Sequence, residues 1–147
     1  MRTFFSILGP LLLGVLAWAA GPMPDTFFVH FADPVVVHKD LTLPPGNYKF
    51  QRIVKPTDPA VFTIIDTDHN KVVGITGPAV LASRADDYIH DKTVVVVDQV
   101  DGKNYLDSAN LQGFGHTFLF YVPSDIREAA MKQGKQIKLE AQAGGID

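Results

Sequence analysis

Three oxygen-bearing side chains occur at alternate positions in one polar segment, Asp66, Asp68 and Asn70. Alternate carboxylate and amide oxygens in a tight loop can converge on one hard cation such as Ca²⁺. The calcium-loop pattern fails further on, because Lys71 stands where the loop needs glycine and Gly77 where it needs the bidentate glutamate. Asp and Asn also favour turns. The segment therefore predicts a solvated hairpin turn, with its three oxygen-bearing residues as candidate ligands for a hard cation.

Histidines are the second group that could do chemistry, since imidazole binds zinc and copper. The chain has His30, His38, His69, His90 and His116. No His-x-His or His-Glu-x-x-His spacing occurs among them, so none forms the ligand pair that such motifs provide. We expect no metal and no cofactor, and we interpret these residues as strand or surface histidines. His116 lies in an apolar segment, which predicts a buried, hydrogen-bonded ring.

The serines and aspartates do not form a recognisable catalytic motif. No Gly-x-Ser-x-Gly elbow surrounds any of the serines. Beyond the predicted signal peptide, these serines are Ser83, Ser108 and Ser124. Two carboxylates could serve as acid and base, as in glycosidases, only if they face each other across a cleft. The aspartates considered for that role are Asp86, Asp87, Asp91 and Asp98. We interpret them as a hydrated acidic region and assign no catalytic residue.

Composition excludes several classes of partner. The 147 residues include 13 basic and 16 acidic side chains, which gives a formal charge of -3, and 46% of the residues are hydrophobic. These values are typical of one globular domain. The chain lacks the basic stripe that a nucleic-acid backbone requires, so we expect no nucleic-acid partner. Cysteine is absent, which excludes disulfides and thiolate chemistry.

The N-terminal residues predict export. Arg2 supplies a positive charge, an apolar stretch covers 4–16, and a small-x-small motif at 17–19 fits a signal-peptidase site. We predict a signal peptide at 1–19 and a single mature domain at 20–147, in the periplasm or outside the cell. A retained anchor is the alternative, but its apolar run of about 17 residues is at the lower limit for spanning a bilayer. After cleavage we expect no membrane association.

Most of the remaining chain alternates short β-strand patterns with turn residues. The expected strands are 27–37 with a break at Pro34, 48–54, 60–65, 71–75, 79–82, 93–100, 104–106, 114–122 and 136–141. Ser124 is expected to cap one short C-terminal helix that ends before Gly134. A mainly β fold follows, with an antiparallel two-sheet sandwich as the first architecture and a small barrel as the alternative.

One turn has a distinctive sequence, Leu43-Pro44-Pro45-Gly46-Asn47-Tyr48. Proline fixes φ in the turn, and Gly46 can take the positive φ of a type II turn. Tyr48 is expected to pack over the turn and to hydrogen-bond a nearby backbone group. Together Leu43, Pro44, Pro45, Gly46 and Tyr48 predict a structural turn that sets the register of the flanking strands.

This Leu-Pro-x-Gly-x-Tyr turn, placed after an exported leader and before a hairpin at 62–73, resembles small uncharacterised exported β-rich proteins of acidobacterial type. A similar turn is found in prealbumin-like and collagen-adhesin B-type sandwich domains. The resemblance implies an exported, Ig-like β-sandwich. It implies no activity and no catalytic residues.

Two functional hypotheses remain. The first is an exported, non-enzymatic β-sandwich module of the cell envelope that acts in binding, adhesion or assembly, with an envelope protein or a second copy as its partner. The alternative is a small secreted hydrolase or metal-dependent enzyme that uses His and Asp side chains. Aromatic residues favour no particular ligand, because Tyr88, Tyr105 and Tyr121 are dispersed and are interpreted as half-buried strand residues.

Overall fold

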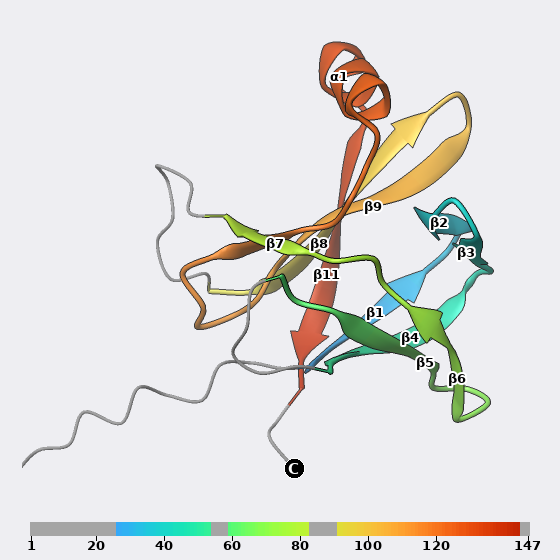
Figure 1. Ribbon diagram of the computed structural model, residues 1–147, viewed down its shortest axis with the longest axis vertical. Coiled ribbons are helices and arrows are strands. Elements are labelled where there is room, and N and C mark those ends of the chain that lie inside the picture. Colours follow the sequence, from blue (N-terminus) through green and yellow to red (C-terminus); the bar gives the residue numbers. More distant parts are fainter. Residues whose placement is uncertain (1–25, 54–58, 83–90, 145–147) are drawn as a thin grey trace, which may run out of the picture.

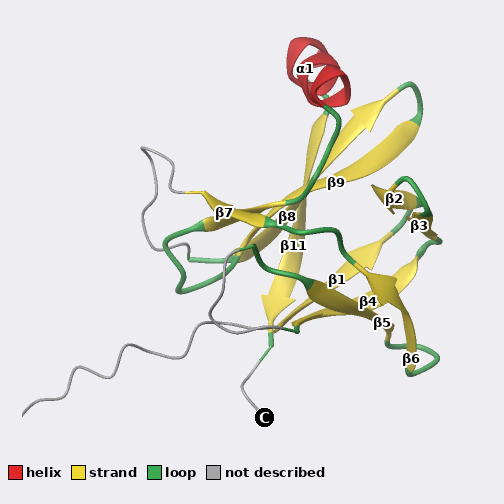
Figure 2. Ribbon diagram, viewed as in Figure 1, coloured by secondary structure: helices red, strands yellow, loops and turns green. Residues whose placement is uncertain are grey.

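The computed structural model describes residues 26–53, 59–82 and 91–144, and it is a mainly β-protein with one helix in that part of the chain (Figures 1 and 2). The elements are β1 (Thr26–Phe31), β2 (Val35–His38), β3 (Leu41–Leu43), β4 (Gly46–Arg52), β5 (Phe62–Asp66), β6 (Lys71–Ile75), β7 (Val80–Ala82), β8 (Thr93–Val100), β9 (Lys103–Asn110), β10 (Thr117–Leu119), α1 (Ser124–Gln133) and β11 (Gln136–Ala143). Within these ranges no helix has the length and hydropathy needed to cross a membrane. The mainly β class and the single C-terminal helix are confirmed.

The strands follow one continuous curved path rather than two separate layers. Their order is β3-β2-β9-β8-β11-β1-β4-β5-β6, while β10 joins β9 and β7 joins β10. The two end strands approach each other at Gly74 of β6, where a Cβ atom would lie only 2.7 Å from a methyl carbon of Leu41 in β3. The absence of a side chain at Gly74 therefore permits this close approach. Of the two expected architectures, the small barrel is the one observed.

The inside of the barrel is filled by phenylalanines from several strands. The rings of Phe27 and Phe50 are stacked with their centroids 4.8 Å apart. Phe62 meets Phe27 edge-on at 5.7 Å and Phe118 edge-on at 5.1 Å. All four side chains are fully buried. Aromatic pairs of this kind add specific contacts to the burial of apolar area, so these residues fix how β1, β4, β5 and β10 pack together.

Strand β8 is buried on both faces, as its four consecutive valines indicate. Val95 and Val97 belong to the barrel core. Val96, Asp98 and Val100 are also buried, and strand alternation puts them on the opposite face. Helix α1 packs against β8. Figure 1 shows α1 at the same end of the molecule as the hairpin between β8 and β9, so the helix covers a small second core outside the barrel.

The start of α1 differs from the expectation. Pro123 holds the N-cap position without a side-chain cap, so the predicted capping role of Ser124 is wrong and Ser124 is the first helical residue. Proline satisfies this position because its fixed φ directs the chain into the helix. The end of α1 is as expected, since Gly134 has the left-handed φ of 63° and directs the chain into β11.

The predicted long strand at 114–122 is mostly wrong, because only Thr117–Leu119 forms β10. Gly113 has φ 75°, which makes a turn before the strand. His116 consequently precedes the strand and is exposed, rather than buried in it as predicted. Its ring lies edge-on against Phe114, with the centroids 5.3 Å apart.

The turn between β3 and β4 also differs in one detail. Gly46 is not among the residues with positive φ, so the type II conformation expected there does not occur. Gly46 is instead the first residue of β4 and lies opposite Phe31 of β1. The two prolines, Pro44 and Pro45, lie between the strands. Since their rings already restrict φ, they direct the chain from β3 into β4 without a left-handed glycine.

Candidate functional site

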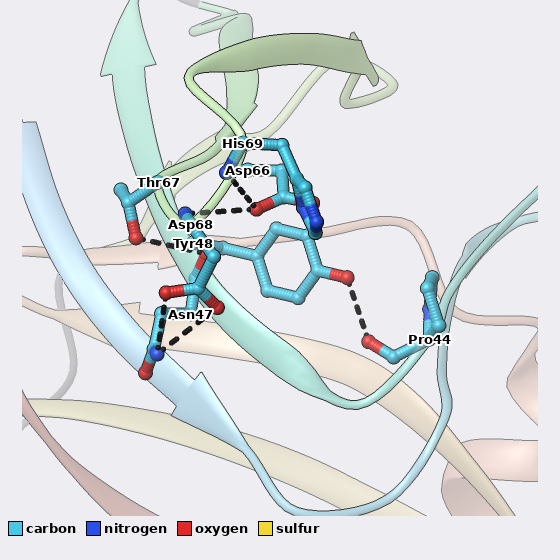
Figure 3. A network of polar contacts seen from close by, with 7 residues as sticks. All are labelled: Pro44, Asn47, Tyr48, Asp66, Thr67, Asp68 and His69. Atoms are coloured by element: carbon cyan, nitrogen blue, oxygen red, sulfur yellow. Dashed lines mark hydrogen bonds and ion pairs between the residues drawn. The ribbon is translucent and has the colours of Figure 1, made fainter.

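The segment with three oxygen-bearing side chains forms a turn whose carboxylates are occupied by the chain itself (Figure 3). Oδ1 of Asp66 accepts the backbone N–H groups of Asp68 and His69, at 2.9 and 3.2 Å. The carboxylate of Asp68 accepts both of its contacts from the side-chain amide of Asn47, at 3.0 and 3.2 Å. Asn70 takes the left-handed φ of 49° that this residue type tolerates. The arrangement is that of an Asx turn joined to β4.

Asp66 and His69 make the closest polar pair of this turn. Oδ2 of Asp66 lies 2.7 Å from Nδ1 of His69. This hydrogen bond raises the pKa of His69 above its ordinary value, and it lowers the pKa of Asp66. The carboxylate of Asp66 orients the imidazole of His69, as the acidic residue of a catalytic triad orients its histidine base. In the described ranges, however, no serine or threonine hydroxyl contacts His69. The pair therefore lacks the nucleophile that a triad requires.

Tyr48 lies over the turn that precedes it. Its hydroxyl donates to the carbonyl oxygen of Pro44 at 2.7 Å, and the residue is 2% exposed. Burial raises the pKa of Tyr48, and the charges of Asp66 and Asp68 raise it further. Leu43 is also buried. Leu43 and Tyr48 thus anchor the turn in the core, while Pro44 and Pro45 are exposed.

The other sequence candidates that lie in the described residues do not form one metal-binding or catalytic group. His30 contacts the Asn47 side chain at 2.8 Å, and Nδ1 of His38 accepts the backbone N–H of Asp40 at 3.3 Å. Across 26–53, 59–82 and 91–144, no group of three His, Asp or Glu side chains could hold a metal ion. Ser108 is buried in β9. The candidates outside the described residues are Ser83, Asp86, Asp87, Tyr88 and His90.

One aspartate lies in a different environment from the hydrated region that was predicted. Asp98 is fully buried under α1. Its Oδ1 accepts the Gln136 side-chain amide at 2.8 Å. Beside it, Asp107 of β9 is paired with Arg127 of α1, whose Nε and Nη2 lie 2.9 and 2.8 Å from Oδ1. The prediction for Asp98 is wrong because a helix far along the chain covers its strand.

A depression with a volume of about 700 Å³ lies between β2, β9 and the start of α1. We call it the tyrosine groove. It is lined by Val36, Val37, His38, Lys39, Thr42, Lys103, Tyr105, Tyr121, Val122, Pro123, Asp125 and Ile126. Its size is within the range of about 300–1,000 Å³ that small-molecule sites occupy. Tyr121 is 72% exposed, which is unusual for a large aromatic side chain.

Cationic groups predominate in the tyrosine groove. Lys39 and Lys103 line it with one carboxylate, Asp125. The nearest ion pair of Lys39 is a long surface contact of 3.9 Å to Asp40, which contributes little. The groove also contains the first turn of α1, whose N–H groups have no side-chain cap and add positive partial charge. An acidic protein therefore has a locally cationic, aromatic groove.

Sequence reasoning missed this groove. The contributing residues come from four separate segments, and each has an ordinary strand or loop pattern by itself. The interpretation of Tyr121 as a half-buried strand residue is wrong, because β10 ends at Leu119 and Tyr121 lies exposed between that strand and α1. Compared with models of protein families, curated proteins and solved structures, the chain has no match.

Proposed function

We propose that the chain is an exported, non-enzymatic binding module of the cell envelope, and that the tyrosine groove binds an amphipathic anion. The observation that carries this proposal is the combination of an apolar floor, two tyrosines and two lysines in one depression. Tyrosine offers a flat apolar ring and a polar hydroxyl. Lysine supplies a flexible point charge for a carboxylate, sulfonate or phosphate.

The α1 side of the groove is held in place by an ion pair whose carboxylate is buried and whose arginine is partly exposed. Ile126 lines the groove, and the next residue, Arg127, is bonded to Asp107 of β9. A second bond from Arg127 reaches the carbonyl oxygen of Phe120 at 3.2 Å. These contacts fix the start of α1 against the sheet, so the groove exists before a ligand arrives. A preformed site reduces the entropy lost on binding.

Dye binding to the folded chain tests the proposal. The probe is 8-anilinonaphthalene-1-sulfonate, and the matched uncharged probe is N-phenyl-1-naphthylamine, which lacks only the sulfonate. We expect saturable fluorescence enhancement with the anionic dye, at least tenfold weaker binding in the double variant Lys39→Met/Lys103→Met, and little change in the binding of the uncharged dye. Tyr121→Ala should weaken the binding of both dyes.

Lys71→Met is the matched control, since Lys71 is exposed on β6 and does not line the groove. It should bind both dyes as the unmodified chain does. Equal binding of the anionic dye by all variants would exclude the tyrosine groove as the anion site.

Export is tested by the N-terminus of the protein that is recovered from the export compartment. The proposal expects this protein to begin at Ala20. Soluble protein that retains Met1 would contradict the export part of the proposal.

A further inference from the structure

Strands β1 and β11 are neighbours in the sheet, but they pair over a short length only. Phe27 and Phe28 of β1 lie opposite Ala143 and Gln142 of β11. By contrast, β4 pairs along the whole of β1, and β8 pairs with β11 over 136–141. In Figure 1 the two strands meet near the end of the β11 arrow and then separate. We call the opening between them the β1–β11 seam.

Hydrogen bonding shows which backbone groups of β1 face the seam. The carbonyl oxygen of Thr26 accepts the N–H of Gly144 at 2.7 Å, on the β11 side. Successive residues of a strand direct their backbone groups to opposite edges, so Phe28 and His30 also face β11. Phe28 pairs there with Gln142. No described strand pairs with His30 on that edge.

The same argument applies to β11. The carbonyl oxygen of Lys135 accepts the N–H of Gln99 at 2.8 Å, on the β8 side. By the same alternation, the backbone groups of Ile137, Leu139 and Ala141 also face β8. The backbone groups of Lys138 and Glu140 therefore face the seam, and none of the described strands pairs with them there. Each edge thus has backbone donors and acceptors that no described strand pairs, and such an edge is a template for another strand.

Two cavities lie along the seam. One, of about 330 Å³, touches His30 on the β1 side and Glu140 on the β11 side. The other, of about 60 Å³, touches Phe31 and Leu139, with Val97 of the core beneath. The second cavity has room for a small apolar side chain. The smaller cavity thus reaches the edge of the barrel core.

We propose that the β1–β11 seam accepts an extended segment of a partner protein as an additional strand, by main-chain pairing with β11. Side chains of that segment would alternate between the core side and the outside. Those facing the core must be small and apolar, because they meet Phe31 and Leu139. This surface is separate from the tyrosine groove, and it goes beyond the function proposed for that groove.

Charge indicates which residue the segment presents outward. Glu140 already has an ionic partner, since its carboxylate lies 2.8 Å from Nζ of Lys92. Lys138 makes no ion pair in the described part of the chain, and it lies on the exposed side of β11. Opposite charges on adjacent strands stabilise their pairing. The expected partner segment therefore alternates small apolar residues with polar ones, and it has an acidic residue next to Lys138.

Amide hydrogen exchange with a synthetic peptide tests this assignment. The probe is an end-blocked hexapeptide in which valine alternates with threonine and a central glutamate. The control peptide has the same sequence with N-methyl groups on alternate residues, which removes the donors of one edge. We expect the first peptide to slow the exchange of the His30, Lys138 and Glu140 amides by at least tenfold, and the N-methylated peptide to leave them unchanged.

A charge exchange tests the register. Lys138→Glu should weaken binding of the glutamate peptide at least tenfold, and a peptide with lysine at that position should restore it. Lys71→Glu is the control and should bind the original peptide normally, and Tyr121→Ala should do so too, because it alters only the groove. If no peptide slows the amide exchange of His30, Lys138 and Glu140, the proposal is overturned. Protection that rises with protein concentration in the absence of peptide would assign the seam to a second copy and would also overturn it.

Discussion

The Gln136 side-chain amide donates to Oδ1 of Asp98 at 2.8 Å, while Oδ2 of the same carboxyl is buried and has no hydrogen-bond partner among the described residues. One half of this carboxyl is thus satisfied and the other half is not. Burial raises the pKa of Asp98 above 3.8, and the charge of Asp107 acts in the same direction. The Gln136 bond and the Arg127 charge act against this rise. Burial has the largest effect, so ionised Asp98 destabilises the folded chain.

This carboxyl predicts a pH-dependent loss of stability. The pKa of Asp98 is higher in the folded chain than in the unfolded one, so the protonated carboxyl stabilises the fold. This stabilisation is fully present below about pH 3.9 and is lost as pH rises through the folded pKa. Asp98→Asn keeps an acceptor for Gln136 and removes the charge. We expect the variant to exceed the unmodified chain in free energy of unfolding at pH 7 by on the order of 1 kcal/mol.

Urea denaturation at pH 3.5 and pH 7 measures the difference between Asp98→Asn and the unmodified chain at each pH. The prediction requires the difference to be larger at pH 7. Asp125→Asn, an exposed position on α1, is the control and should show a smaller dependence on pH. The same difference at both pH values would mean that the carboxyl is not ionised by pH 7 or not desolvated in the folded chain.

Arg127 predicts a second, larger effect on stability. Arg127→Met removes the donors of Asp107, whose side chain is 4% exposed, and leaves that carboxylate buried without its partner. Loss of one partner of a buried pair costs about 3–5 kcal/mol, and the partial exposure of Arg127 reduces this to roughly 2 kcal/mol. Urea denaturation measures the loss. Because Arg127 fixes the start of α1, the variant should also bind the anionic dye more weakly.

The double variant Arg127→Met/Asp107→Asn is the decisive comparison for this pair. It removes both charges, so it should recover much of the stability lost in Arg127→Met. Lys132→Met removes an exposed contact of 3.8 Å to Glu128 and should change the free energy of unfolding by less than about 0.5 kcal/mol. A double variant as unstable as Arg127→Met would show that packing of the arginine stem matters more than its charge.

Much of the fold followed from local patterns. The valines of β8 and the alternation of Ile137, Leu139 and Ala141 in β11 indicated their strands correctly. Asp101 and Gly102 also form the expected hairpin turn, with φ values of 50° and 75°. These features are set by residues close in sequence, so a single sequence is enough to predict them.

The candidate sites depended on contacts that a sequence does not display. Asp98 meets Gln136 across 38 residues of chain, and its burial depends on where α1 lies. The tyrosine groove likewise exists only because the start of α1 packs near β2 and β9. The strand predicted at 114–122 was shortened by the turn at Gly113, whose φ of 75° a strand pattern of apolar residues conceals. Long-range packing decided each of these cases.

The Asp66–His69 pair predicts a measurable histidine titration. The hydrogen bond from Asp66 raises the pKa of His69 above 6.5. Since the folded chain has a higher pKa for His69 and a lower pKa for Asp66 than the unfolded chain, the pair stabilises the fold fully between about pH 4 and pH 6.5. This contribution is lost as pH rises through the folded pKa of His69 or falls through that of Asp66. Asp66→Asn should return the pKa of His69 toward its ordinary value. NMR titration of the ring measures this change, and Asp40→Asn, outside the turn, should leave it unaltered. An unchanged His69 pKa in Asp66→Asn would contradict the prediction.

Tyr48 predicts how much the turn between β3 and β4 contributes to stability. Tyr48→Phe keeps the buried ring and removes the bond to the Pro44 carbonyl oxygen, so we expect a loss of about 1 kcal/mol. Tyr48→Ala also leaves a cavity, which should raise the loss to about 3–5 kcal/mol.

Gly46→Ala is the comparison within the same turn. Its Cβ would lie 3.5 to 3.7 Å from the Tyr48 side chain, an ordinary contact, and φ is not positive there. Thermal and urea denaturation should therefore find Gly46→Ala close to the unmodified chain. A large loss in Gly46→Ala, or a neutral Tyr48→Ala, would show that the glycine rather than the tyrosine determines the geometry of this turn.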